Sequence, residues 1–144
     1  MICYAESSAV LAWLYGEPRG PEVLRVLIGA RRVVSSDLTL LECDRGLRRR
    51  VAAGELTDSA ADRARAVLKA SQPQWEIIPL APRVLEFSRR SFPREPVRSL
   101  DALHLGAALF ARSTTPDLRI LTLDERVSAN ARLLGFPVEP APSR

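Results

Sequence analysis

The sequence ICYAESSAVLAWLYG, from Ile2 to Gly16, contains a complete strand-to-helix junction. Its first four residues form a short apolar run that predicts a buried strand. Ser7 and Ser8 are favourable N-cap residues, and the apolar stretch after them predicts a helix that ends at the glycine. Between strand and helix lies one acidic residue, Glu6. Similar strand-to-helix junctions recur along the rest of the chain.

Short apolar runs and helical segments alternate to the end of the chain. Further strands are expected at residues 32–35, 75–78, 118–121 and 136–138. Helices are expected at 22–28, 37–53 (or from 39), 58–70, 84–90, 100–112 and 125–134. This alternation predicts an α/β fold with a parallel sheet covered on both faces. No repeat or linker interrupts it, so we expect a single domain over residues 1–139 and a short tail at 140–144.

The basic residues are almost all arginines. The chain has 144 residues and a formal net charge of +4, and Lys69 is its only lysine. Arginine suits bidentate contact with phosphate, which favours a nucleic-acid partner. A solvated basic surface would give the same composition, so charge alone does not decide between them.

The sequence contains little that points to export or to a membrane. Cys3 and Cys43 are the only cysteines, too few for a disulfide framework or a zinc site. The N-terminus lacks the basic and apolar regions of a signal peptide, and no run of about 18 apolar residues predicts a membrane span. We therefore expect a cytoplasmic protein without a membrane partner.

Four acidic residues lie where strands give way to helices, or in the first turns of helices: Glu6, Glu42, Asp101 and Asp124. Ligands of open parallel sheets bind at the carboxyl ends of the strands, so these side chains are expected to lie near one another. Carboxylates that are gathered and buried ionise together only when a cation compensates them. Oxygen ligands suit Mg²⁺ or Mn²⁺. The pattern therefore predicts metal-assisted hydrolysis of phosphodiesters.

Each acid also has an ordinary structural interpretation. Glu6 and Asp101 suit the positive ends of helix dipoles, and Asp124 suits the N-cap of the last helix. Glu42 is spaced to pair with arginines along its own helix. The metal hypothesis rests on all four occurring together in one small domain.

At these residues the sequence resembles the VapC toxins, which are PIN-domain proteins. The resemblance covers nearly the whole chain, and the matching motifs are Glu6–Ala9, Ser35–Glu42, Leu100–Leu105, Leu121–Arg126 and Leu134–Phe136. It implies a three-layer α/β/α PIN-like domain with a central parallel sheet. It also implies an Mg²⁺- or Mn²⁺-dependent endoribonuclease that hydrolyses RNA with a metal-activated water. Such a protein would be the toxin of a VapBC-like toxin–antitoxin pair, a homodimer, and the partner of a cognate antitoxin.

The resemblance assigns roles to particular residues. Glu42, Asp101 and Asp124 match the family's acidic positions, which implies that they hold or position metal together with the first acid. Thr122 matches a hydroxyl residue of the same motif, and we expect it to support the acids.

The sequence departs from the family at its first acid, which is normally aspartate and is here Glu6. Ser7 and Ser8, which follow it, are expected to assist it. The additional methylene moves the carboxylate outward, and Mg²⁺ tolerates geometric error poorly. The alternative function is therefore a catalytically weak PIN-like module that binds RNA or an antitoxin.

Other residues near the acids have a functional and a structural interpretation. RNA contacts are expected from arginines in the same regions, Arg45, Arg49, Arg94 and Arg98, with a solvated surface as the alternative. His104 is the only histidine and is interpreted as a packed helical residue. Trp13 and Tyr15 are expected in the core, in a groove for an antitoxin helix or a dimer partner, or divided between the two.

A phospho-receiver domain is the alternative from a different class, because it too has a parallel sheet with an acidic pocket. That chemistry needs a lysine beside the phosphorylated aspartate. The only lysine, Lys69, lies in the middle of an expected helix, far from any strand end, so we set this class aside.

Overall fold

The computed structural model describes residues 1–141, and the end of the expected tail, 142–144, lies outside the described residues. The elements in chain order are β1 (Ile2–Ala5), α1 (Ser7–Tyr15), α2 (Gly20–Gly29), β2 (Arg32–Ser36), α3 (Asp37–Ala52), α4 (Asp58–Ser71), a 3₁₀ turn (Gln72–Gln74), β3 (Trp75–Ile78), α5 (Pro82–Ser88), α6 (Ser99–Arg112), β4 (Leu118–Leu121), α7 (Glu125–Leu133) and β5 (Val138–Glu139). Each expected helix and strand is present, with ends that differ by a few residues.

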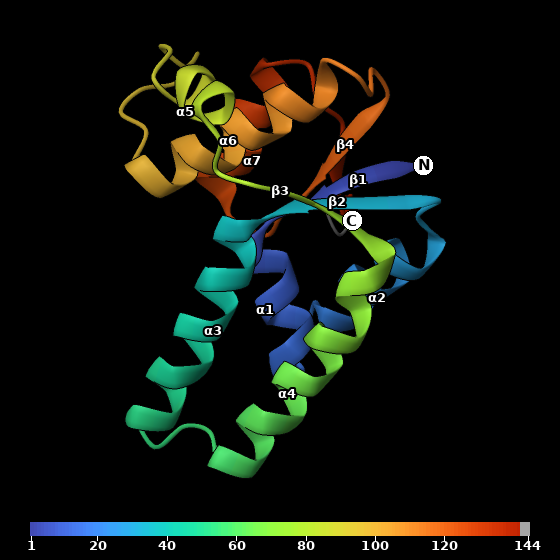
Figure 1. The fold of residues 1–144 in the computed structure, drawn as a ribbon, viewed down its shortest axis with the longest axis vertical. Helices are drawn as coiled ribbons and strands as arrows, with labels where there is room; N and C mark the ends of the chain where they lie inside the picture. Colours follow the sequence, from blue (N-terminus) through green and yellow to red (C-terminus); the bar gives the residue numbers. More distant parts are fainter. Residues whose placement is uncertain (142–144) are drawn as a thin grey trace.

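The strands form one parallel sheet in the order β3-β2-β1-β4-β5. Helices α1 to α4 lie on one side of this sheet, and α5 to α7 lie on the other (Figure 1). The expected three-layer α/β/α fold is therefore confirmed. Within residues 1–141, every helix is too short or too polar to cross a membrane.

Side chains alternate across the sheet and build a core on each side of it. On β1, Cys3 and Ala5 pack against the layer of α1 to α4. Tyr4, between them, points to the layer of α5 to α7, where it contributes to the other core. Leu105 of α6 is fully buried in that second core, and burying such a side chain stabilises the fold by about 1.5–3 kcal/mol.

Helix α5 packs very closely on α6 at a glycine. A Cβ atom on Gly106 would lie 2.9 Å from the carbonyl oxygen of Val84 and 2.9 Å from the backbone nitrogen of Ser88. The two helices can therefore approach this closely only because position 106 has no side chain.

Two local expectations are corrected by the structure. Glu6, rather than Ser7 or Ser8, is the N-cap of α1, and its carboxylate accepts a hydrogen bond from the backbone N–H of Ser8. The last strand covers Val138–Glu139 and not 136–138, because the side chain of Phe136 is buried in the core before the chain reaches the sheet edge.

Candidate active site

The register of the sheet places Glu6 beside Thr122. Strands β1 and β4 are neighbours, and Ala5 pairs with Leu121. The next residues, Glu6 and Thr122, therefore leave the carboxyl edge of the sheet together, with the N–H of Glu6 3.0 Å from the carbonyl oxygen of Leu121. This is the edge at which open parallel sheets bind their ligands.

The carboxylate of Glu6 is buried and surrounded by donors. Its Oε1 accepts hydrogen bonds from the hydroxyl of Ser7 (2.8 Å) and the N–H of Ser8 (3.1 Å). Its Oε2 accepts from the hydroxyls of Ser8 and Thr122, the latter at 2.7 Å. A carboxylate offers about four lone-pair positions. The four donors therefore occupy the accepting capacity of Glu6, and all of them belong to Ser7, Ser8 and Thr122.

Glu42 reaches the same place from the second turn of α3. Its Oε1 lies 2.5 Å from Nε2 of His104 and accepts a hydrogen bond from Ser7 at 3.1 Å. Ligand atoms of Glu6, Glu42 and His104 all lie within 4.8 Å of one another, which is close enough for the three to hold a metal ion. Two of the four expected acids thus meet in one tight group.

His104 is the residue in this group that the sequence interpretation did not assign to the site. It is buried in α6 as expected, but its imidazole contacts Glu42 through Nε2 and the hydroxyl of Tyr4 through Nδ1, at 3.1 Å. The spacing of His104 from Asp101, one helical turn, was the only signal that placed it on the same side of α6 as an acid.

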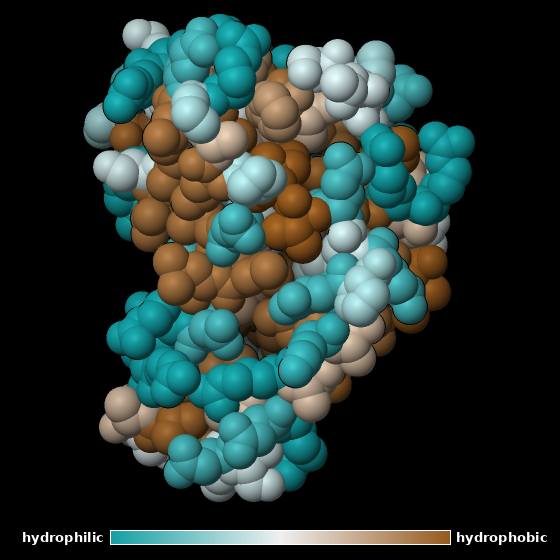
Figure 2. Space-filling model, viewed as in Figure 1, coloured by the Kyte–Doolittle hydropathy of each residue, from teal (hydrophilic) through white to brown (hydrophobic). Residues whose placement is uncertain are grey.

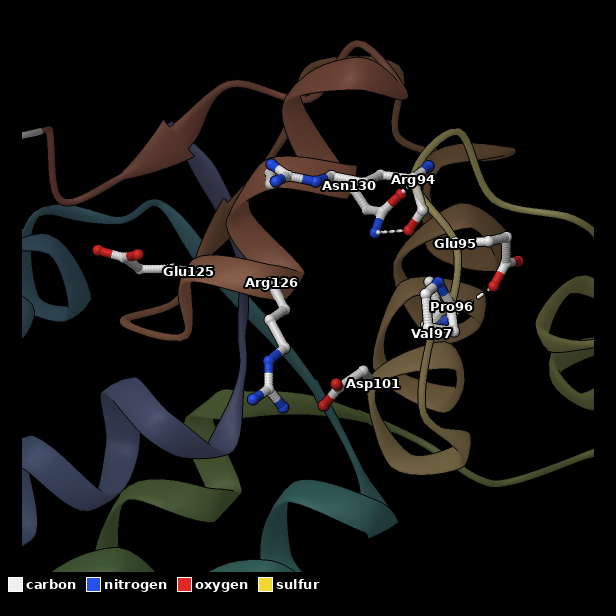
Figure 3. Close-up of a pocket in the computed structure, with 9 residues that line it drawn as sticks. Arg94, Glu95, Pro96, Val97, Asp101, Glu125, Arg126 and Asn130 are labelled. Carbon is white, nitrogen blue, oxygen red and sulfur yellow. Dashed lines mark hydrogen bonds between the residues drawn. The ribbon is translucent and has the colours of Figure 1, made fainter.

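Asp101 lies outside the tight group. It is buried in the first turn of α6, and its Oδ2 accepts a hydrogen bond from Nε of Arg98 at 3.1 Å. It also lines a pocket of about 260 Å³ between the loop 89–98 and α7. Arg126 of α7 extends into this pocket toward Asp101 (Figure 3).

Asp124 also lies outside the tight group and is the N-cap of α7. Its Oδ1 accepts hydrogen bonds from the N–H groups of Arg126 (2.8 Å) and Val127 (3.1 Å). Its own N–H contacts the hydroxyls of Ser8 (3.0 Å) and Thr122 (3.1 Å), the same hydroxyls that donate to Glu6. Asp124 is thus connected to Glu6 through two intervening side chains.

The expected RNA-contacting arginines lie on two different parts of the surface. Arg45 and Arg49 are exposed on α3, and Arg94 and Arg98 are exposed in the loop before α6. The loop is held by Asn130 of α7, whose side-chain amide donates to the carbonyl of Arg94 at 3.0 Å and accepts from its N–H at 2.9 Å (Figure 3).

The charge of Glu42 is stabilised by its neighbours. Burial alone would raise the pKa of the Glu42 carboxyl, but hydrogen bonds from His104 and Ser7, with the charge of Arg49, lower it below its ordinary value. Glu42 is therefore ionised at neutral pH, as a metal ligand has to be.

The fold and this edge of the sheet define a class of protein: a three-layer α/β/α domain whose acidic side chains gather at the carboxyl ends of parallel strands. A comparison with protein families identifies the family within this class, because residues 3–133 match the PIN domain. The chain belongs to the PIN-domain family, and at the level of the family this makes it a nuclease. A comparison with curated proteins gave no match.

Solved structures of toxin–antitoxin proteins have the same fold. VapC20 of Mycobacterium tuberculosis, a toxin that cleaves the sarcin–ricin loop, has a TM-score of 0.66 and 19% identity, over 97% of this chain and 99% of that one. FitAcB of Neisseria gonorrhoeae has a TM-score of 0.64 and 19% identity, over 96% of both chains. DNA-bound VapBC of Salmonella typhimurium has a TM-score of 0.61 and 18% identity, over 96% of this chain and 98% of that one. The resemblance to VapC-like PIN-domain proteins is thereby confirmed.

Proposed function

We propose that the protein is a metal-dependent endoribonuclease, the toxin of a VapBC-like toxin–antitoxin pair. The observation that carries the proposal is the meeting of Glu6 and Glu42, from β1 and α3, at the carboxyl edge of a PIN-domain sheet. The substrate class is RNA, and the bond hydrolysed is the phosphodiester.

The unused oxygens of the acids support a divalent cation as cofactor. Among the described residues, no hydrogen bond reaches Oε2 of Glu42, Oδ1 of Asp101 or Oδ2 of Asp124. Each of these three acids therefore keeps one oxygen available, and carboxylate oxygens suit Mg²⁺ or Mn²⁺. Glu6 differs, because a metal contact would require one of its four donors to leave. When bound, the ion supplies an activated water and positive charge for the phosphate.

The arginines of the chain provide contacts for the RNA backbone. Arg94 and Asp101 line the same pocket, so a phosphate contacted by Arg94 would lie near Asp101, one of the proposed metal ligands. Arg98 already neutralises Asp101 in part. Arg45 and Arg49 extend the basic surface along α3.

The surface also offers apolar regions for the proposed protein partners. Trp13 lines two neighbouring hollows, one against α2 and β3 and the other against α4, which suits an apolar segment of an antitoxin. A separate hydrophobic area lies between the α5–α6 region and the start of α3 (Figure 2). Leu41, Leu85 and Leu100 are the large exposed apolar residues of these three helices. Exposed apolar areas of this kind favour protein contacts, here the second copy of a homodimer.

The proposed activity is tested by incubating purified, antitoxin-free protein with total bacterial RNA and Mg²⁺ or Mn²⁺. We expect cleavage that a chelator stops and that Asp101→Asn abolishes, while Asp62→Asn, on the exposed face of α4, cleaves like the wild type. Thermal melts show whether the Asp101→Asn protein is folded. A folded Asp101→Asn protein that still cleaves would contradict the role of Asp101.

A second candidate function is favoured by the hydrogen bonding of Glu6. Because four donors occupy its carboxylate, the protein in this arrangement binds RNA or an antitoxin without cleaving RNA efficiently. In that case the wild type binds RNA in an anisotropy assay but leaves it intact, and Glu6→Asp gains metal-dependent cleavage. Cleavage by the wild type at the rate of Glu6→Asp would exclude this candidate.

A further inference from the structure

The pocket beside Asp101 is lined by two arginine side chains that have no partner in the protein. It has a volume of about 260 Å³, and it lies between the loop before α6, the first turn of α6 and helix α7. The two arginines are Arg94 and Arg126. Among residues 1–141, no ion pair and no hydrogen bond engages the guanidinium group of either one. The pocket therefore contains two positive charges that the protein itself does not pair.

The carboxylates that line the same pocket are engaged elsewhere or point away from it. Both oxygens of Glu95 accept hydrogen bonds from backbone N–H groups of their own loop, at 2.9 and 2.7 Å. Oδ2 of Asp101 is paired with Arg98. Glu125 lines the edge of the pocket, and its carboxylate points away from Asp101 (Figure 3). None of these acids therefore forms an ion pair with either of the two arginines.

Arg126 is directed from α7 toward Asp101. Figure 3 shows the two side chains pointing toward one another, yet no ion pair or hydrogen bond joins them within the part of the chain that the structure describes. Arg126 is the second residue of α7, where the helix dipole disfavours a positive charge. Neither helix stability nor an ion pair therefore explains this position of Arg126, whereas an anion bound in the pocket does.

A phosphate group matches the size and the charge of this pocket. Its volume of about 260 Å³ is many times what a single water molecule needs, so a phosphodiester has room there. Guanidinium groups bind phosphate oxygens through two parallel N–H···O bonds. Asp101, at the side of the pocket, is one of the proposed metal ligands. A phosphodiester bound here would therefore lie next to the one that reaches the metal.

We propose that Arg126 binds a phosphodiester of the RNA strand in this pocket, beside the phosphodiester that is hydrolysed. Arg94 lines the same subsite and adds a second positive charge. The strand then leaves the acidic edge of the sheet between α7 and the loop before α6. RNA as the source of the phosphodiester rests on the proposed function, whereas the binding of a phosphate group by Arg126 does not.

The subsite is tested by measuring RNA binding without metal, so that the RNA stays intact. Fluorescence anisotropy gives the Kd of a labelled single-stranded RNA in EDTA at a series of salt concentrations. We expect Arg126→Gln to weaken binding about 10-fold, as for the loss of a hydrogen bond to a charged group. We also expect the slope of log Kd against log salt to fall by about 0.7, the value for one phosphate contact on a single strand.

The matched control is Arg132→Gln, because Arg132 is an exposed arginine in the last turn of the same helix. We expect this variant to bind RNA like the wild type. Arg126→Lys keeps the positive charge, so it should keep the salt dependence of the wild type. Equal RNA binding by Arg126→Gln and Arg132→Gln would overturn the proposal, and so would an Arg126→Lys protein with the slope of Arg126→Gln.

Thermal melts separate phosphate binding from a structural role of Arg126. We expect Arg126→Gln to have a Tm no lower than that of the wild type, because the change removes a positive charge from the first turn of α7. If Arg126 instead stabilised the fold by neutralising Asp101, Arg126→Gln would lose stability together with RNA binding. That result would overturn the proposal.

Two further measurements identify the source of the phosphate. Inorganic phosphate is added at constant ionic strength, and we expect it to leave RNA binding by the wild type unchanged, because several contacts hold a strand. Displacement of the RNA by phosphate would indicate a site for the free anion and overturn the RNA assignment. Cleavage of RNA by the wild type with Mn²⁺, measured in parallel, tests the proposed function alone. Binding that depends on Arg126 in a protein without cleavage would support the subsite and reject the nuclease, and no RNA binding by the wild type would overturn the subsite.

Discussion

Replacing Glu6 with aspartate removes one methylene from a side chain that accepts four hydrogen bonds. Asp is itself a favoured N-cap residue, so the bond to the N–H of Ser8 can be kept. The bond from Thr122, 2.7 Å from Oε2, crosses from β4 and cannot follow a shorter side chain. We therefore expect Glu6→Asp to lose this bond and to free one of the lone-pair positions of the carboxylate.

The structure gives the size of the effect. A hydrogen bond to a charged group contributes about 1.5–3 kcal/mol, and a domain of this size shifts by roughly 4 °C per kcal/mol, so we expect Tm to fall by about 6–12 °C. The freed lone-pair position should at the same time strengthen Mn²⁺ binding and metal-dependent RNA cleavage. Stability and activity are thus expected to change in opposite directions.

The assays are thermal unfolding of metal-free protein, Mn²⁺ calorimetry and RNA cleavage. Glu55→Asp is the matched control, because that side chain is 61% exposed and its change should shift stability by less than about 0.5 kcal/mol. A Glu6→Asp protein as stable as Glu55→Asp would refute the described hydrogen bonding of Glu6. A destabilised variant with unchanged Mn²⁺ affinity would refute the link between that bonding and metal access.

Three further predictions concern the rest of the fold. Gly106→Ala should destabilise the protein by about 1–3 kcal/mol in urea unfolding, because a Cβ there would lie 2.9 Å from the backbone of α5. Burial raises the pKa of the Cys3 thiol to about 12 and also raises that of Cys43, so neither should react with iodoacetamide at pH 8 until the protein is unfolded; rapid reaction of native protein would contradict this. Asn130→Ala should loosen the loop before α6, which we expect to appear as faster trypsin cleavage in that loop and weaker RNA binding. Unchanged trypsin cleavage would show that the loop keeps its structure without the hydrogen bonds of Asn130.

Most of the fold could be predicted because its signals are local. The apolar runs at Trp75–Ile78 and Leu118–Leu121 are strands with the expected bounds. The last strand was misplaced because an aromatic residue, Phe136, was assigned to the strand, whereas it precedes the strand and packs in the core between the sheet and helices α5 to α7. Sequence pattern shows that a residue is buried, but not which neighbouring element buries it.

The site could be predicted only in part. The end of β1 and the start of α3 place Glu6 and Glu42 near one edge of the sheet, and the structure brings them together. The positions of Asp101 and Asp124 depend on the orientation of α6 and on a helix cap, which strand order does not determine. His104 was interpreted as packing because a lone histidine in an apolar helix usually packs, and only the three-dimensional contacts reveal its bond to Glu42.

The hydroxyls around Glu6 also determine whether the chain needs a metal ion in order to fold. Clusters of acids often fold only when a cation is present to screen their repulsion. Here three hydroxyl side chains and an imidazole lie against the two glutamates. The chain should therefore fold to its native state in buffer that contains no divalent ions. The supply of metal would then determine when an already folded enzyme becomes active, and not whether it folds.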